Sequence, residues 1–258
     1  RLFAPVNAAG AEIGRRALRR EPRIPVMQWL QHADAIAQLS VPSFEYPRPD
    51  DVAAQLRFLG PVSVSGAVQH ALPEWWSELD GTRPVVHVTQ GTIANTDLGE
   101  LIRPTIDAFA DREPLVVVAT GGASADSLGA LPGNVRVAEF LPYAELLPRT
   151  SVMVTNGGYG GAQFALRHGV PLVVAPGKED KVEVAARIAW SGVGVRLRHQ
   201  RPTPEELRKA VGRVLADPSY AQAAQRVGAE IVASPGAAGF ARVVDEAICA
   251  VSPVEPCP

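Results

Sequence analysis

Apolar residues after position 84 alternate between short uninterrupted runs and longer stretches with helical spacing. The runs PVVHVTQGT, PLVVVATGG, NVRVAEFL, VMVT, LVVA and VGVRL predict six short strands. Strands as apolar as PLVVVATGG are typical of parallel sheets that are covered on both faces. Between the first two runs, the segment LGELIRPTIDAFAD repeats its apolar residues close to helical spacing. This alternation predicts an α/β fold with a doubly wound, Rossmann-like parallel sheet.

The pattern is weaker before this region and changes again after it. A predicted helix at Ala9–Arg20 carries four arginines, which indicate a solvated face rather than a phosphate site, and Pro22 and Pro25 end it. Trp75 and Trp76 are expected to pack on a domain surface rather than to stack on a ligand. The predicted division is 1–62, the end of an N-terminal domain; 63–84, a linker; 85–236, a C-terminal domain; and 237–258, a last helix and tail.

Composition excludes several classes of function. The 258 residues carry a net charge of -2, so there is no basic excess for nucleic acid or an anionic membrane. No apolar run approaches the roughly 20 residues that span a bilayer, and no secretory leader is visible. We therefore expect a cytoplasmic protein. Cys249 and Cys257 lack metal-ligand spacing and are predicted to be free thiols rather than a disulfide.

The chemistry of the chain is predicted to centre on a glycine-rich loop. Residues 156–161 contain four glycines and stand between the predicted strand Val152–Thr155 and the predicted helix Ala162–His168. Glycines let backbone N–H groups approach an anion, and the helix adds the positive end of its dipole. The Gly91–Thr92 turn, Gly121 and Gly122, and the turn at Glu179 also follow predicted strands. Because ligands of such sheets bind at the carboxyl ends of the strands, these segments predict one cleft for a nucleotide or another phosphorylated ligand.

Several blocks at matching separations make residues 139–181 similar to a known family. They are Phe140 with Pro142, Leu146 with Leu147, Thr155–Gly161, Ala165 with Leu166, Gly169–Pro171, Pro176, and Asp180 with Lys181. This pattern resembles the donor-binding signature of GT-B glycosyltransferases that use nucleotide sugars, the family of the natural-product and macrolide glycosyltransferases. The resemblance implies a GT-B fold with an incomplete N-terminal domain in this chain. It also implies that the last helix returns to that domain.

The resemblance implies a role for each matching residue. Phe140 would lie against the base, with the backbone of Leu141 bonding the base edge, and the glycines would offer amides to the diphosphate. Asp180 and Lys181 would bind the transferred sugar, opposite Gly91 and Thr92. The implied donor-binding residues are Gly91, Thr92, Phe140, Leu141, Asn156, Gly157, Gly158, Tyr159, Gly160, Gly161, Gln163, Glu179, Asp180 and Lys181.

The sequence departs from the family pattern at several of these positions. Asn156 replaces a histidine and would leave a neutral amide donor for a phosphate oxygen, worth about 1.5 to 3 kcal/mol. Phe164 stands where many members place a glutamate for the ribose, and Gln163 is the possible substitute. Tyr159 is expected either to form an acceptor wall or to pack. Glu179 and Asp180 either bind sugar or only cap the helix that begins at Lys181.

The implied reaction is the inverting transfer of a hexose from a UDP- or dTDP-sugar to a hydroxyl of a small apolar acceptor, a natural product or lipid. The family's general base is a histidine near the start of the N-terminal domain, and none of His32, His70, His87, His168 and His199 matches it. The catalytic residue is therefore unassigned. No Asp-x-Asp pair indicates a metal, and no cofactor is expected beside the nucleotide sugar.

Two alternatives remain. One is a non-catalytic donor-binding subunit or activator with a separate acceptor-binding partner, and the other is a nucleotide-sugar epimerase on the same fold. A homodimer or a partner subunit is possible in either case.

Overall fold

The computed structural model describes residues 4–19, 24–25, 28, 30, 32–50, 54–62, 71–92 and 95–251. Among the predictions above, Arg20, His70, Cys257, residues 63–70 of the linker and the tail from Ser252 lie outside the described residues. The chain divides into two compact units. The first combines residues 1–39, 47–59 and 235–258, and the second combines 40–46 and 60–234.

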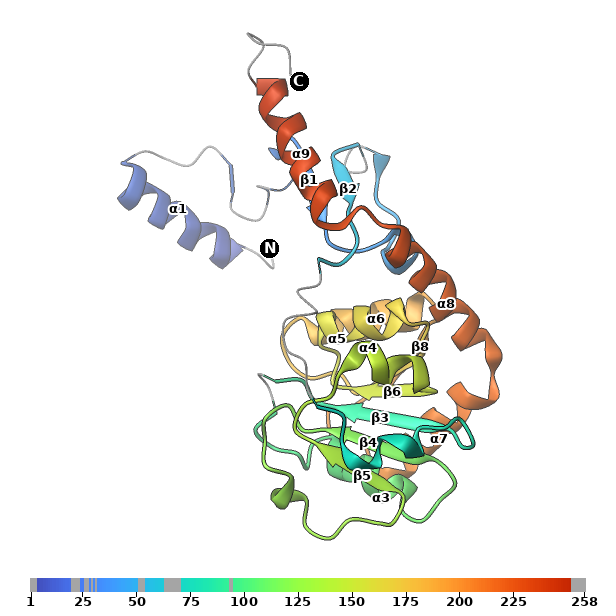
Figure 1. Cartoon of the computed structure of the whole chain (residues 1–258). Helices are drawn as coiled ribbons and strands as arrows, with labels where there is room; N and C mark the ends of the chain where they lie inside the picture. Colours follow the sequence, from blue (N-terminus) through green and yellow to red (C-terminus); the bar gives the residue numbers. More distant parts are fainter. Residues whose placement is uncertain are drawn as a thin grey trace. The chain divides into compact units, whose positions relative to one another are not determined.

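The second unit contains a six-stranded, fully parallel sheet in the order β5-β4-β3-β6-β7-β8 (Figure 1). This order confirms the predicted doubly wound sheet, because the chain starts at the centre with β3 and winds outward in both directions. The strands are β3 (Val85–Thr89), β4 (Leu115–Ala119), β5 (Val135–Ala138), β6 (Val152–Thr155), β7 (Leu172–Val174) and β8 (Gly194–Arg196). The helices are η2 (Pro42–Phe44), η3 (Glu74–Glu78), α3 (Ile102–Phe109), η4 (Ala125–Leu128), α4 (Tyr143–Leu146), η5 (Leu147–Arg149), α5 (Tyr159–Arg167), α6 (Lys181–Trp190), α7 (Pro204–Ala216) and α8 (Pro218–Ala233).

Each strand sends alternate side chains to the two faces of the sheet, and both faces are buried. Val86, Val118 and Val154 pack on one face with residues of α3 and α7. Met153 and Val174 pack on the other face with residues of α5, α6 and α8. Figure 1 shows these two helical layers on opposite sides of the strands. The central strands of the sheet can therefore carry apolar side chains on both faces.

The first helix runs from Ala4 to Leu18, earlier than the predicted Ala9–Arg20. Two helices of the second unit differ from the predicted bounds for local reasons. The helix α5 begins at Tyr159, so the glycine loop is three residues shorter than predicted and Gly160 and Gly161 form part of the first turn. The helix α3 begins only at Ile102, because the buried side chain of Gln90 accepts hydrogen bonds from the N–H groups of Leu101 and Ile102. Trp75 and Trp76 pack against a core cluster, as expected.

The first unit consists of α1 (Ala4–Leu18), β1 (Ile36–Gln38), β2 (Leu56–Phe58) and α9 (Gly236–Val251). Strands β1 and β2 are parallel, and the N–H of Gly236 donates to the carbonyl of Leu59 just after β2. Arg15 and Arg16 form exposed ion pairs with Glu12, which fits a solvated helix face. The prediction of free thiols is wrong for Cys249, which is disulfide-bonded.

Residues 40–46, which we call the strap, pack in the second unit although both flanking segments belong to the first. Phe44 is buried, and its ring stacks on that of Tyr159 at 6.4 Å. The carboxylate of Glu45 is 1% exposed and lies 3.2 Å from the guanidinium of Arg187 on α6. The strap therefore touches the first turn of α5 and the middle of α6.

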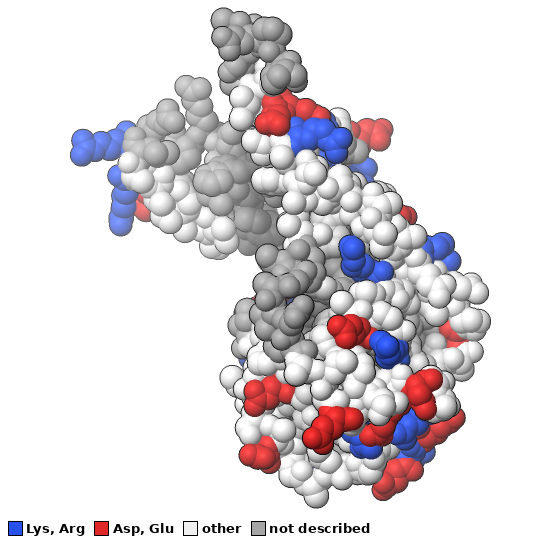
Figure 2. Space-filling view, in the orientation of Figure 1, with Lys and Arg blue, Asp and Glu red and all other residues white. Residues whose placement is uncertain are grey.

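The described surface carries mixed charge. On the face shown in Figure 2, acidic and basic side chains of the second unit are interspersed, with no single basic patch. Within the described part of the chain, no helix is both long and apolar enough to cross a bilayer.

Candidate functional site

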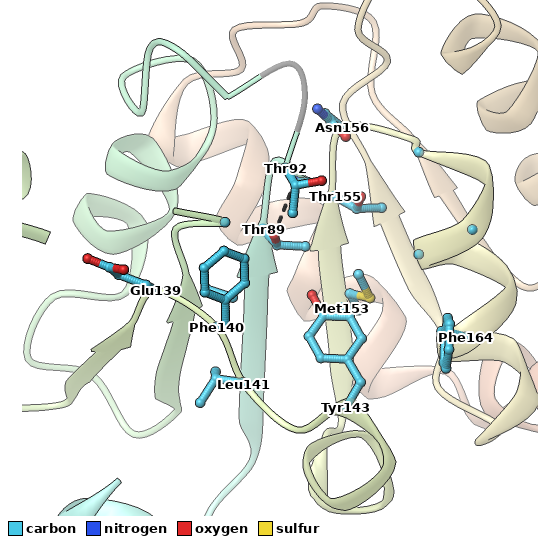
Figure 3. A pocket seen from close by; sticks show the side chains of 16 residues that line it. Thr89, Thr92, Glu139, Phe140, Leu141, Tyr143, Met153, Thr155, Asn156 and Phe164 are labelled. Atoms are coloured by element: carbon cyan, nitrogen blue, oxygen red, sulfur yellow. Dashed lines mark hydrogen bonds between the residues drawn. The ribbon is translucent and has the colours of Figure 1, made fainter. Parts of the chain in front are cut away.

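A cavity of about 320 Å³ opens at the carboxyl ends of β3 and β6 (Figure 3). This is the edge of the sheet where the sequence predicted a cleft, and the volume is at the lower end of the range for small-molecule sites. Eight of the predicted donor-binding residues line it: Gly91, Thr92, Phe140, Leu141, Asn156, Gly158, Gly160 and Gly161.

The first turn of α5 forms one wall of the cavity. Gly158 is the N-cap and has no side chain with which to cap the helix, so the first N–H groups of α5 have no side-chain acceptor there. Gly160 and Gly161 follow in the first turn and also line the cavity. Absence of side chains leaves these backbone donors, and the positive end of the helix, open to an anion.

The loop before α5 is held in one conformation by its neighbours. Gly157 has φ +93°, which other residues rarely adopt, and a Cβ there would lie 3.1 Å from the carbonyl of Lys181. Asn156 is buried, and its side-chain nitrogen donates to the carbonyl of Gln90 over 2.6 Å. This bond joins the end of β6 to the end of β3 across the top of the cavity. One amide hydrogen of Asn156 is used in it.

The opposite wall is formed by the segment after β5. Phe140 is 42% exposed, and its ring faces the cavity while it covers Gly122. Any Cβ on Gly122 would come within 3.3 Å of the ring. Gly121, at φ +67°, allows a still closer approach of the loop after β4 to the carbonyl of Gly91. An exposed aromatic face beside a cavity is suited to stacking on a planar group.

Beneath these walls the cavity is mostly apolar. Tyr143, Met153 and Phe164 line this part, and the rings of Tyr143 and Phe164 meet edge to face at 6.4 Å. Burial raises the pKa of Tyr143 to about 12, so its phenol stays protonated. Among the described lining residues, Glu139 at the rim is the one charged side chain. An anion in this cavity would therefore be met by backbone donors rather than by cations.

The other six predicted residues do not line the cavity. Tyr159 points into the strap, where its hydroxyl lies 3.4 Å from Glu45, so packing is its observed role. Gln163 is 4% exposed and buried on α5, while its neighbour Phe164 reaches the cavity. Gly157 lies behind the loop it shapes.

Glu179, Asp180 and Lys181 lie just outside the lining. Glu179 is exposed with φ +64°, and its carboxylate pairs with the ammonium of Lys181 at 3.4 Å. Asp180 occupies the N-cap of α6, but its side chain makes no capping hydrogen bond there. The N–H of Gly177 donates to the carbonyl of Asn156, which holds this turn against the glycine loop.

Two further lining residues were named from the sequence, Gly121 in the predicted cleft and Phe164 at the position of a ribose-binding glutamate. Sequence reasoning missed the remaining lining residues: Thr89, Ala119, Glu139, Tyr143, Met153 and Thr155. Most end a strand or directly follow one, so the rule that ligands bind at the carboxyl ends of strands could have found them. Tyr143 and Met153 carried no such signal, since one belongs to a short helix and the other lies within an apolar strand.

Known proteins resemble this chain in sequence and in structure. The chain is 50% identical over 194 residues to 4'-demethylrebeccamycin synthase of Lentzea aerocolonigenes, covering 75% of this chain and 45% of that protein. It is 40% identical over 222 residues to UDP-glycosyltransferase 2 of Phaeomoniella chlamydospora, covering 83% and 48%. The solved structure of the glycosyltransferase VinC in complex with dTDP matches with a TM-score of 0.63 and 28% identity, covering 83% and 52%. The chain thus spans less than half the length of these two curated relatives.

A family model gives the assignment. The model described as erythromycin biosynthesis protein CIII-like, C-terminal domain, matches residues 103–247, which is more than half of the chain. This stretch includes the glycine loop, α5 and the Phe140 wall. The chain therefore belongs to this family, that of the GT-B natural-product glycosyltransferases that its sequence resembles.

Proposed function

We propose that this protein is the donor-binding part of an inverting glycosyltransferase that moves a hexose from a UDP- or dTDP-sugar to a hydroxyl of a small apolar acceptor, a natural product or lipid. The observation that carries the proposal is the cavity between the uncapped first turn of α5 and the exposed ring of Phe140. The first wall suits a diphosphate and the second suits a base. Both belong to one cavity of nucleotide size.

The proposed binding mode assigns a role to each wall. The base stacks on Phe140, and the diphosphate meets the N–H groups of Gly158, Gly160 and Gly161. When the sugar leaves, negative charge grows on the diphosphate, and the fixed backbone donors stabilise that charge without reorganisation. Phe164 packs near the nucleoside sugar, and Asp180 with Lys181 contacts the transferred hexose. The general base is assigned to no residue of this chain.

The proposal needs no metal or other cofactor, because backbone donors meet the phosphate charge. The donor-binding subunit without turnover is the weaker hypothesis, since the relatives are named as a synthase and transferases. The nucleotide sugar and the acceptor are the proposed small-molecule partners. We propose a cytoplasmic location on the grounds of composition alone.

Thermal unfolding of the purified chain with UDP, dTDP, UMP and inorganic pyrophosphate tests the proposal. A ligand that binds the folded state raises the melting temperature, by an amount that grows with its concentration over Kd. We expect UDP or dTDP to stabilise more than UMP, because UMP lacks the second phosphate. Pyrophosphate alone should act weakly, because it lacks the base.

The matched control repeats the titration with Phe140→Ala. Loss of the base wall should reduce stabilisation by UDP and leave the small effect of pyrophosphate unchanged. An unfolding temperature that responds to no nucleoside diphosphate would refute the proposal.

A further inference from the structure

His87 is a fully buried residue of β3 that the proposed binding mode does not use. Its Nδ1 lies 2.9 Å from the carbonyl oxygen of Val117 on the neighbouring strand. Its Nε2 lies 3.0 Å from the hydroxyl of Tyr143, whose ring lines the cavity. The two rings meet edge to face at 5.2 Å. His87 is therefore connected to the cavity through Tyr143.

The partners of His87 fix the position of its proton. A carbonyl oxygen can only accept, so Nδ1 carries the hydrogen. Burial lowers the pKa of His87 to about 4, so the ring is neutral at physiological pH and Nε2 is an acceptor. The hydroxyl of Tyr143 must then donate to Nε2. Its single hydrogen is used, and its oxygen can only accept from other groups.

The same contact extends to the cavity wall. The rings of Tyr143 and Phe164 meet edge to face at 6.4 Å, and both residues line the cavity. One row of contacts thus runs from His87 through Tyr143 to Phe164.

The bond to His87 has a consequence for a ligand. It holds the ring of Tyr143 in the apolar part of the cavity, and Tyr143 packs on Phe164, which lies near the nucleoside sugar in the proposed binding mode. Loss of the bond would let the ring of Tyr143 move and would weaken nucleotide binding.

We infer that His87 is a positioning residue for nucleotide binding: through its hydrogen bond to Tyr143, it holds in place the rings of Tyr143 and Phe164 that line the cavity. The inference rests on the proposed function, because it assumes that the cavity binds a nucleoside diphosphate. His87 touches no ligand in this arrangement. It acts through the hydrogen bond to Tyr143, while its bond to Val117 only fixes the tautomer.

Two substitutions separate these bonds. The side-chain oxygen of His87→Gln can take the place of Nε2 and accept from Tyr143, whereas the shorter His87→Asn can reach only the carbonyl of Val117. We expect the full chain with His87→Gln to bind UDP within about twofold of the unchanged protein, by titration calorimetry. His87→Asn should bind about fivefold more weakly, the effect of one lost hydrogen bond.

Tyr143→Phe provides a second route that keeps the ring in the wall and avoids a cavity at His87. It should also weaken UDP binding about fivefold, and combining it with His87→Asn should add nothing further, because both remove the same bond. Thr105→Val is the matched control: it deletes a buried hydroxyl that donates to the carbonyl of Leu101 on α3, away from the cavity, and should leave UDP binding unchanged.

A stability measurement in urea accompanies each titration. A purely structural role predicts that UDP affinity follows stability, so that His87→Gln and His87→Asn weaken binding alike. That result, or normal UDP binding by Tyr143→Phe, overturns the inference. If the unchanged protein binds neither UDP nor dTDP, the proposed function fails instead.

Discussion

The side-chain amide of Asn156 donates a 2.6 Å hydrogen bond to the carbonyl of Gln90, and so joins the two loops that border the cavity. Asn156→Asp removes the donor, places two acceptors against each other and adds a negative charge beside the diphosphate seat. We expect stability to fall by about 2 kcal/mol and UDP binding to weaken at least about tenfold. Urea unfolding and calorimetry measure the two effects.

Asn134→Asp is the control for this substitution. Asn134 is also buried and donates to backbone carbonyls, among them that of Phe109, but it precedes β5 at the far end of the sheet. The Asn134→Asp variant should lose a similar amount of stability and keep the UDP affinity of the unchanged protein. Equal loss of affinity in both variants would show that the Asn156 bond has no specific role at the site.

Removal of the Phe140 ring should affect ligand binding more than folding. The ring is 42% exposed, so Phe140→Ala sacrifices little buried area, but a stacked base contributes about 1 to 3 kcal/mol. We expect roughly tenfold weaker binding of UDP. Phe240→Ala, at an exposed phenylalanine of α9, should leave UDP affinity unchanged. Retention of full affinity by Phe140→Ala would exclude the ring as the base platform.

Two glycine substitutions should change stability in opposite directions. Gly157 has φ +93° and lies close to Lys181 and Val174, so Gly157→Ala should cost about 2 kcal/mol. Gly212 lies within α7 with open space around it, so Gly212→Ala should stabilise by about 1 kcal/mol. Chemical denaturation compares both with the unchanged protein. A stabilised Gly157→Ala would contradict the conformation described for the glycine loop.

The ion pair between Glu45 and Arg187 should matter for folding, because it is nearly removed from solvent. Glu45→Gln removes the buried carboxylate beside the guanidinium of Arg187, which is 17% exposed, and leaves it the more exposed carboxylate of Glu183 at 3.6 Å, at a cost of about 3 kcal/mol. Asp107→Asn, in the exposed pair with Arg103, makes the same chemical change and should cost at most about 0.5 kcal/mol. Similar costs for both would mean that the strap is loosely held.

His87 should make stability depend on pH. Burial lowers the pKa of His87 from 6.5 to about 4. Between pH 4 and pH 6.5, His87 is therefore mostly protonated in the unfolded chain and mostly neutral in the folded chain. The stability that neutral His87 contributes is therefore complete above pH 6.5 and is lost as pH falls toward 4. Between pH 7.5 and 5 we expect a loss of about 2 kcal/mol that is absent in His87→Gln.

Urea unfolding at the two pH values measures this difference. His199→Gln, at an exposed histidine, should keep the pH dependence of the unchanged protein. A pH dependence that persists in full in His87→Gln would assign it to other groups.

The sequence predicted the features that depend on local pattern. The six strands of the large sheet are apolar runs, and the glycine loop stands directly after one of them, so their order along the chain predicted the sheet and the position of the cavity. The predicted start of α5 was wrong because Tyr-Gly-Gly has a low helix propensity. The first turn is nevertheless helical at Tyr159, because α5 packs against α8 and the strap.

Contacts between distant segments could not be predicted in this way. Nothing near Glu45 in the sequence indicates that it pairs with Arg187. The sequence likewise predicts only that His87 lies in a strand, and its hydrogen bond to Tyr143 depends on the tertiary fold. The turn at Glu179 to Lys181 was assigned by position in a motif. In the structure the ion pair between its two ends draws those side chains together beside the cavity lining.

The strap has a consequence for recombination between relatives. Because residues 40–46 pack with the second unit and interrupt the first, the portion that folds around the cavity is not one continuous stretch of gene. A hybrid made by a single crossover after residue 60 would set the strap of one parent on α5 and α6 of another. Exchange of donor preference by gene splicing should therefore transfer both stretches together.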